Sequence, residues 1–394
     1  MRILLLTPFL PDPAASHGGG AYLGNLATAL SQEADVGLVA IVRRQEHDTL
    51  DRRDVQWRWH ATLPYRERPP SGGLPHQMRM LWHWRRLPLV AAKHWQPEMA
   101  RVLTRARTEF RPDVVLVELA QMAQYLPLLR DVPTILTDHE GGCPANSSTG
   151  LGAWGDRRDA ELWARYVDQY YPLASLVQAV TREDAEGLAR RLGREVLVRP
   201  PTCAVPSTAV APDRAPARVL FLGDYRHHPN PEAATTLAHE VLPLLRAVDP
   251  TTELWLAGPN EERVRSLGNK AGVRVLGYVP DLRELFGQVR LLLAPLWSGS
   301  GFRMKVLAAL AHGLPVVTNT LGGRGCEAPA PARQIAEGPR ALADAALSLL
   351  RSPANAAEAG RVAFAWARAN LPGAAVARVQ LERAAALLSS ANPL

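Results

Sequence analysis

The chain has 394 residues, of which 47% are hydrophobic, and it carries a formal net charge of +7 with a pI near 9.6. This length suffices for two domains with cores of their own, and no run of about 18 apolar residues appears that would cross a bilayer. The positive charge favours anionic partners such as phosphates or acidic lipid surfaces. Because no recognised nucleic-acid-binding motif accompanies the charge, nucleic acid is not an expected partner.

The N-terminal stretch MRILLLTPFL has one basic residue and a short apolar run. A cleavable signal segment can have this pattern, but residues 4–6 also suit a first buried strand. We favour the strand, because a helical pattern follows it directly. The chain has three cysteines without a CxxC pair, Cys143, Cys203 and Cys326, which predicts a reduced, cytoplasmic protein.

Short β-rich runs alternate with helical segments through the first half of the chain. Continuous apolar strands separated by helices imply a parallel sheet that is covered on both faces. The predicted strands are 2–7, 36–42, 113–119, 134–139, 175–181 and 196–201. A stretch rich in Pro and Ala, 202–217, lacks periodicity and predicts a linker.

The same pattern then restarts, and its opening ARVLFLGDY is similar to the N-terminal MRILLLTPF. The second set of predicted strands is 218–224, 253–259, 273–278, 289–296 and 315–320. We predict an α/β protein with two Rossmann-like doubly wound parallel-sheet domains facing each other across a cleft, with ligands outside the carboxyl ends of the strands. The predicted divisions are a first domain 1–201, the linker 202–217, a second domain 218–373 and a C-terminal helix 374–394 that packs back on the first domain.

Two glycine-rich segments are candidate anion sites. In HGGGAYLGNLATAL, Gly19 and Gly20 open a helix, where the backbone can approach a phosphate; the alternative is a flexible turn. The spacing is not GxGxxG, so a nicotinamide or flavin fingerprint is absent. In SGSGFRMKVLAALAHG, Arg303 and Lys305 lie at a helix start, where cations oppose the helix dipole unless an anion is bound. The alternative is a pair of solvated surface charges.

Two polar stretches lie at the ends of predicted strands. Asp138 and His139 in TDHEGG could supply acid–base chemistry, or His139 could be a structural hydrogen-bonding group. Arg226 in GDYRHHPN could reach a diphosphate, whereas the adjacent histidines make a weak metal site. No Asp-x-Asp occurs, so a carboxylate-held Mg²⁺ or Mn²⁺ is not expected.

A basic stretch with interleaved tryptophans, residues 79–107, has seven Lys or Arg against one acidic residue. Basic residues with interfacial aromatics indicate peripheral contact with an anionic membrane, here the inner membrane face. The alternative is a helix pair that covers the sheet and leaves its arginines in water.

The order of these pieces resembles the glycosyltransferases of family 4, which have the two-domain GT-B fold and use nucleotide-sugar donors. The resemblance covers nearly the whole chain and is strongest in APLWSGSGFRMKVLAALAHGLPVVTNTLGGRGCE, residues 294–327. Residues 221–245 resemble the start of the second domain, and 275–286 resemble the segment that cradles the nucleotide base. By position, the resemblance implies these donor-binding residues: Gly19, Gly20, Arg226, Tyr278, Val279, Gly299, Ser300, Gly301, Arg303 and Lys305.

The chain departs from the family pattern at three positions. Asp224 stands where many members have an arginine, for which Arg226 could substitute. Ser300 and Ala308 replace the two glutamates that members commonly place near the sugar and near the ribose. Ala308 cannot accept a ribose hydrogen bond, a loss that costs about 1–3 kcal/mol if the ribose hydroxyl stays unsatisfied.

The resemblance implies a retaining hexosyltransferase of carbohydrate biosynthesis that needs no metal and no cofactor beyond the nucleotide-sugar co-substrate. Lys305 and Arg303 would stabilise the leaving diphosphate, and His139 with Asp138 would act at the sugar or the acceptor. The acceptor could be a saccharide, a lipid-linked saccharide or a natural product. The replaced glutamates leave open a non-catalytic partner subunit, and a nucleotide-sugar epimerase on the same fold is a further alternative.

Overall fold

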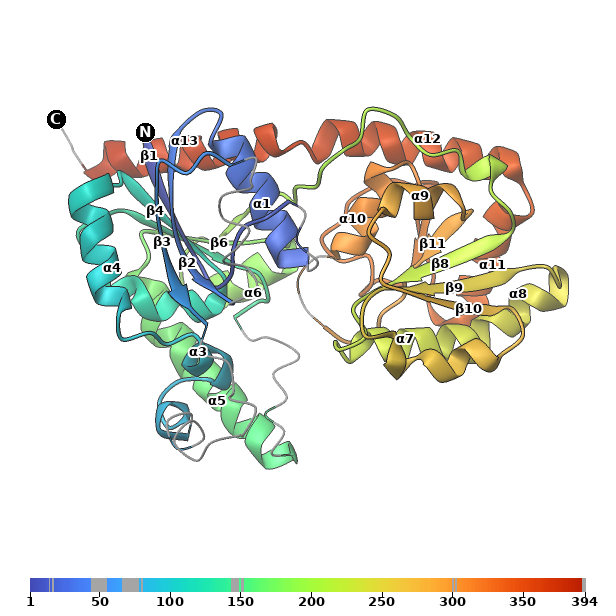
Figure 1. The fold of residues 1–394 in the computed structure, drawn as a ribbon, viewed down its shortest axis with the longest axis horizontal. Coiled ribbons are helices and arrows are strands. Elements are labelled where there is room, and N and C mark those ends of the chain that lie inside the picture. Colours follow the sequence, from blue (N-terminus) through green and yellow to red (C-terminus); the bar gives the residue numbers. More distant parts are fainter. Residues whose placement is uncertain are drawn as a thin grey trace. The chain divides into compact units, whose positions relative to one another are not determined.

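The computed structural model describes residues 1–13, 15, 18–43, 55–65, 78, 81–142, 149, 152–299, 301 and 303–391. The chain divides into unit 1, Met1–Pro200 with Gly373–Leu394, and unit 2, Pro201–Pro372. Each unit is a parallel sheet flanked by helices (Figure 1). The prediction of two parallel-sheet α/β domains is therefore confirmed.

Within the described residues, unit 1 contains a seven-stranded parallel sheet in the order β3-β2-β1-β4-β5-β6-β7. The strands are β1 (Arg2–Thr7), β2 (Asp35–Val42), β3 (Trp59–Pro64), β4 (Val114–Glu118), β5 (Thr134–Asp138), β6 (Leu176–Ala179) and β7 (Leu197–Val198). The sequence did not indicate β3, because this edge strand is mostly only half-buried and lacks a continuous apolar run.

The helices of unit 1 cover both faces of its sheet (Figure 1). They are α1 (Gly18–Leu30), α3 (Leu89–Lys93), α4 (Met99–Arg105), η2 (Ala106–Phe110), η3 (Ala120–Leu128), α5 (Gly152–Tyr170), η4 (Tyr171–Leu173), α6 (Arg182–Leu192) and α13 (Gly373–Ala391). Leu4 and Leu6 of β1 join a core with residues of α4, α5 and α6. Since successive strand residues point to opposite faces, Ile3 and Leu5 point to the other face. The C-terminal helix α13 packs against α1.

Within the described residues, unit 2 contains a six-stranded parallel sheet in the order β10-β9-β8-β11-β12-β13. The strands are β8 (Arg218–Leu222), β9 (Glu253–Ala257), β10 (Val273–Gly277), β11 (Leu291–Leu293), β12 (Val316–Thr318) and β13 (Arg333–Ile335). The prediction missed β13, which is three residues long and has no fully buried residue.

Two separate cores flank the sheet of unit 2. Val219 and Phe221 of β8 pack with α7, η6, α8 and α11, whereas Leu220 packs with α9, α10 and α12. This alternation is what a strand with both faces buried requires. The helices are η5 (Pro212–Arg214), α7 (Pro229–Thr236), η6 (Leu237–Val241), α8 (Leu242–Val248), η7 (Glu261–Arg263), η8 (Arg265–Asn269), α9 (Leu282–Gly287), α10 (Met304–Ala311), α11 (Gly338–Leu350) and α12 (Pro353–Asn370).

Candidate functional site

Each sheet has one point at which the strand order reverses direction, between β1 and β4 in unit 1 and between β8 and β11 in unit 2. In open parallel sheets, ligands bind outside the carboxyl ends of the strands at such a point. In unit 1, Glu118 is the last residue of β4, His139 follows β5 and Arg199 follows β7. These three side chains form what we call the His139 cluster.

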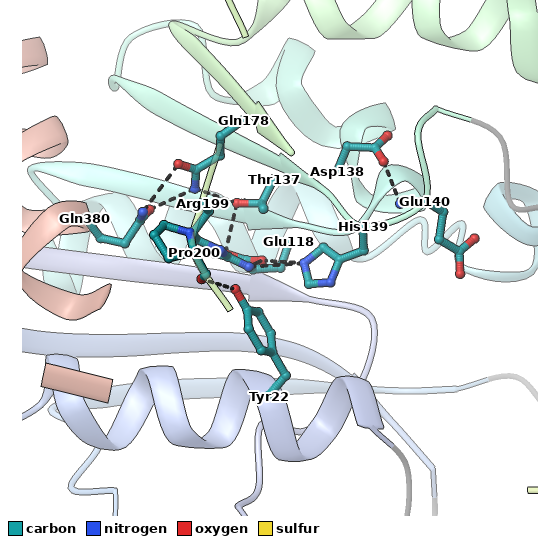
Figure 2. Close-up of polar contacts among 10 residues, drawn as sticks. All are labelled: Tyr22, Glu118, Thr137, Asp138, His139, Glu140, Gln178, Arg199, Pro200 and Gln380. Atoms are coloured by element: carbon teal, nitrogen blue, oxygen red, sulfur yellow. Dashed lines mark hydrogen bonds and ion pairs between the residues drawn. The ribbon is translucent and has the colours of Figure 1, made fainter. Parts of the chain in front are cut away.

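The His139 cluster contains a buried ion pair (Figure 2). The guanidinium of Arg199 donates from Nη1 to Oε1 of Glu118 at 2.6 Å and from Nη2 to Oε2 at 2.9 Å. Both side chains are fully buried. Burial alone would raise the pKa of Glu118, but the charge of Arg199 and the hydrogen bond with His139 outweigh it and hold that pKa well below its usual range.

His139 joins this pair through one ring nitrogen. Its Nε2 lies 3.0 Å from Oε2 of Glu118 and 3.2 Å from Nη2 of Arg199. The side chain is 10% exposed, and the ring of Tyr22 from α1 packs edge-on against it at 5.5 Å between centroids. Burial lowers the pKa of His139, although the hydrogen bond to Glu118 opposes this shift. The lowered pKa favours the neutral imidazole.

A chain of hydrogen bonds links the His139 cluster to the C-terminal helix. Gln380 of α13 accepts from Nε2 of Gln178 at 2.8 Å, and the same Gln178 nitrogen donates to the hydroxyl of Thr137 at 2.8 Å. Thr137 in turn donates to Oε1 of Glu118 at 3.3 Å (Figure 2). The C-terminal helix therefore helps to fix the Glu118 carboxylate through Gln178 and Thr137.

The other predicted catalytic residue, Asp138, lies apart from this cluster. It is fully buried, accepts a hydrogen bond from the backbone N–H of Glu140 at 2.7 Å and is hydrogen-bonded by the hydroxyl of Tyr171. Burial raises the pKa of Asp138. Because adjacent strand residues point to opposite faces, Asp138 and His139 are not brought together.

The glycines that we predicted to open a helix lie in its first turn. Gly19 and Gly20 belong to α1, which starts at Gly18. A Cβ on Gly19 would lie 2.8 Å from the ring of Phe9, so this position has little room for a larger residue. The first backbone N–H groups of a helix lack intrahelical acceptors, which keeps α1 a candidate for anion binding.

In unit 2, Lys305 forms the centre of a second candidate site, the Lys305 site. It lies in the first turn of α10, and its Nζ donates to the Oδ1 of Asn230 at 2.7 Å. The same Nζ lies 4.1 Å from the ring centroid of Phe221. Burial, and next the charge of Arg303, lowers the pKa of Lys305 to about 7. A bound anion would restore its charge.

The loop before α10 carries the predicted glycines. Gly299 has φ of 108° and Gly301 has φ of 71°, a region in which residues with a Cβ are strained. A Cβ on Gly299 would lie 3.1 Å from Nη2 of Arg303, the N-cap residue of α10. Ser300 lies outside the described residues. Ala308 is half-buried on α10.

The remaining predicted donor residues are more exposed. Arg226 forms an ion pair with Asp224 at 2.8 Å, and Asn230 donates to the backbone oxygen of Asp224 at 2.8 Å. Tyr278 follows β10 and is 56% exposed, and Val279 packs partly against the core under α10. Asp224 thus ties the predicted arginine to the residue that holds Lys305.

Sequence reasoning missed Glu118, Arg199 and Asn230. A signal existed for the first two, because one charged residue stands inside each of the otherwise apolar runs VVLVEL and VLVRPP. Such a residue in a buried strand requires a partner of opposite charge. Asn230 carries no comparable signal.

No helix in the described ranges is both long and apolar enough to span a bilayer. Among the same residues, no group of three or more His, Cys, Asp or Glu side chains is arranged to hold a metal ion.

Comparison with known proteins identifies the domain that holds the Lys305 site. Residues 216–352 match the family model described as glycosyl transferases group 1. This part of unit 2 is therefore similar to group 1 glycosyltransferases. The resemblance that the sequence motifs indicated is confirmed for this domain, which runs from β8 through α11. The chain has no match among curated protein sequences.

Solved structures similar to this chain extend over both units. A sucrose-phosphate synthase from Thermosynechococcus elongatus matches with a TM-score of 0.70 at 17% identity, covering 100% of both chains. HepE from Anabaena in complex with UDP and glucose matches with a TM-score of 0.64 at 15% identity, covering 96% of this chain and 98% of that one. A trehalose 6-phosphate synthase from Burkholderia multivorans matches with a TM-score of 0.62 at 13% identity, covering 99% and 100%. At these identities the matches establish the GT-B fold.

Proposed function

We propose that the chain is a retaining, metal-independent glycosyltransferase that moves a sugar from a nucleotide-diphosphate sugar to an acceptor hydroxyl. The observation that carries this proposal is the Lys305 site within the glycosyltransferase domain. Lys305 lies beside Arg303 at the start of α10, behind a loop whose glycines have left-handed backbone conformations. Two cations and a helix N-terminus in one place suit a diphosphate.

In the proposed reaction, the bond between the anomeric carbon and the diphosphate oxygen breaks as the acceptor oxygen bonds to that carbon. Lys305 and Arg303 stabilise the negative charge that develops on the leaving diphosphate, which is commonly the largest catalytic contribution. The acceptor proton passes to the leaving phosphate oxygen on the same face of the sugar. This route accounts for retention and needs no separate base.

We assign donor class and acceptor class from separate observations. HepE is described in complex with UDP and glucose, which makes UDP the first donor nucleotide to test. An exposed apolar patch in unit 1, consisting of Met78, Leu81, Trp82 and Trp154, supports a lipid-linked acceptor. Arg85 stacks over Trp82 at 5.6 Å, which adds positive charge to this patch. Arg79 and Met80 of the predicted membrane stretch lie outside the described residues.

The first experiment is a thermal-unfolding screen of the purified protein with UDP, GDP, TDP and ADP and their sugars. A ligand at about 100 times its dissociation constant adds roughly 2.7 kcal/mol to the free energy of unfolding. A clear rise in Tm with one diphosphate, followed by sugar transfer to an added acceptor, supports the proposal. Binding without transfer or hydrolysis favours the non-catalytic partner subunit. Conversion of the donor without any acceptor favours an epimerase.

A further inference from the structure

The Nε2 atom of His139 has two neighbours, one that could accept a hydrogen from it and one that could donate a hydrogen to it. Oε2 of Glu118, at 3.0 Å, can only accept a hydrogen, whereas Nη2 of Arg199, at 3.2 Å, can only donate one. A neutral imidazole carries one N–H, so the tautomer of His139 depends on which neighbour prevails.

The charges of the cluster decide this competition. Arg199 donates to both oxygens of Glu118, so the carboxylate is ionised and has no proton to offer to Nε2. An unprotonated Nε2 would place its lone pair beside that anion, which is repulsive. An Nε2–H instead makes a charge-assisted hydrogen bond with the carboxylate. The guanidinium of Arg199 already donates from both Nη1 and Nη2 to Glu118, and it lies over the ring of Tyr22 at 5.0 Å. The interaction with the carboxylate therefore prevails, and Nε2 carries the hydrogen that it donates to Glu118.

The other ring nitrogen is then left as an acceptor. Among the residues that the structure describes, no hydrogen bond to Nδ1 of His139 is found. The ring lies where β5 ends, at the edge of the sheet where ligands of this fold bind.

We propose that Glu118 and Arg199 are positioning residues that hold His139 as the Nε2–H tautomer, so that Nδ1 accepts a hydrogen bond from a sugar hydroxyl during transfer. This inference rests on the proposed glycosyl transfer. Glu118 orients the ring directly, and Arg199 acts through Glu118 by keeping it ionised. Neither residue touches the reacting atoms.

The tautomer of His139 can be measured in the unmodified protein. Selective ¹⁵N labelling of histidine, with His139→Gln to assign the signals, gives two-bond ¹⁵N–¹H correlations that distinguish the tautomers. We expect the Nε2–H pattern near pH 7. An Nδ1–H pattern would overturn the inference and leave glycosyl transfer untouched. Conversely, an Nε2–H pattern in a protein without transferase activity would reject the proposed function together with the sugar contact, and would leave only the positioning of His139 by Glu118 and Arg199.

Variants then separate positioning from packing. Glu118→Gln can donate its amide N–H to Nε2, so we expect it to shift the ring toward Nδ1–H and to lower kcat about 10- to 100-fold. Arg199→Lys keeps a charge beside Glu118 and is expected to retain the Nε2–H pattern, whereas Arg199→Met is expected to lose it. Equal spectra for the lysine and methionine variants would show that Arg199 only packs. If these variants do not fold, the spectrum of the unmodified protein still decides.

The kinetic constants identify which hydroxyl His139 contacts. A rise in KM for the nucleotide sugar, with UDP affinity unchanged, assigns Nδ1 to the donor sugar. A rise in KM for the acceptor alone assigns it to the acceptor. The role of His139 in transfer would be overturned if Glu118→Gln switches the tautomer and yet leaves kcat and both KM values unchanged.

Discussion

Arg199 and Glu118 form a bidentate ion pair across 81 residues of sequence, at 2.6 and 2.9 Å, with both side chains fully buried. Removing one partner of such a pair leaves a buried, uncompensated charge, which typically costs about 3–5 kcal/mol. We therefore expect Arg199→Met to lower the free energy of unfolding by that amount. Glu118→Leu should lower it by a similar amount. The double variant should lose much less free energy of unfolding than the sum of the two single losses. Urea denaturation measures this, and additive losses would contradict a charge-pair origin.

Lys305 is expected to be essential for turnover but not for folding. Because its Nζ lies where a diphosphate would bind, Lys305→Ala should lower kcat by about 10²- to 10³-fold, as loss of one transition-state donor typically does. Lys305→Arg keeps the charge and should lower kcat less than Lys305→Ala does. Steady-state kinetics, with Tm as the folding check, tests this. Lys270, an exposed lysine in the same unit, provides the control, since Lys270→Ala should leave kcat unchanged.

Binding of the nucleotide sugar should weaken above pH 7. The pKa of Lys305 is about 7 in the free protein, and the negative diphosphate raises it in the complex. Below pH 7 the lysine is charged in both states, so affinity should not vary on its account. Above pH 7 the free lysine must take up a proton on binding, so affinity should fall by up to about tenfold per pH unit. Calorimetry in buffers of different ionisation enthalpy would detect this uptake. Lys305→Arg should abolish it, and a flat affinity up to about pH 9 would contradict the shift.

Gly24 of α1 is expected to tolerate no side chain. A Cβ there would lie 2.1 Å from the backbone nitrogen of Pro13 and 2.2 Å from the carbonyl carbon of Asp12. Gly24→Ala should lower the free energy of unfolding by about 1–3 kcal/mol or more. Gly187 of α6 is the matched control, because a Cβ there meets nothing within 4 Å. Gly187→Ala should raise stability by about 0.5–1 kcal/mol, and equal effects of the two changes would refute the steric argument.

The apolar patch of unit 1 is expected to bind anionic bilayers. Trp82 is 64% exposed and Trp154 is 65% exposed, and Trp154 packs edge-on against Trp84 at 5.9 Å. In sedimentation with vesicles that contain an anionic phospholipid, Trp82→Ala should reduce binding. Arg85→Ala should weaken it by about 1 kcal/mol. Trp297→Ala in unit 2 serves as the control. Equal binding to neutral vesicles, or no effect of either patch variant, would reject this surface.

Most strands were predictable because each carries its own signal. Runs such as RILLLT and ELWLA are buried on both faces, and burial on both faces requires continuous apolar residues. The two missed strands, β3 and β13, lie at sheet edges, where one face or one end meets water and the apolar signal disappears. Edge position is a property of the sheet rather than of the strand's own residues.

The amino-acid sequence by itself determined the two parallel α/β domains and the glycine loop that leads into Lys305. These features depend on local periodicity, on backbone freedom and on charges near one helix start. Only the tertiary structure decided that Glu118, His139 and Arg199 meet, that Asp138 points away from them and that Asn230 holds Lys305. Such contacts join strand ends that are remote in sequence, so they arise from the strand order and the direction of each side chain. Neither the strand order nor the direction of the side chains can be read from any single segment of the sequence.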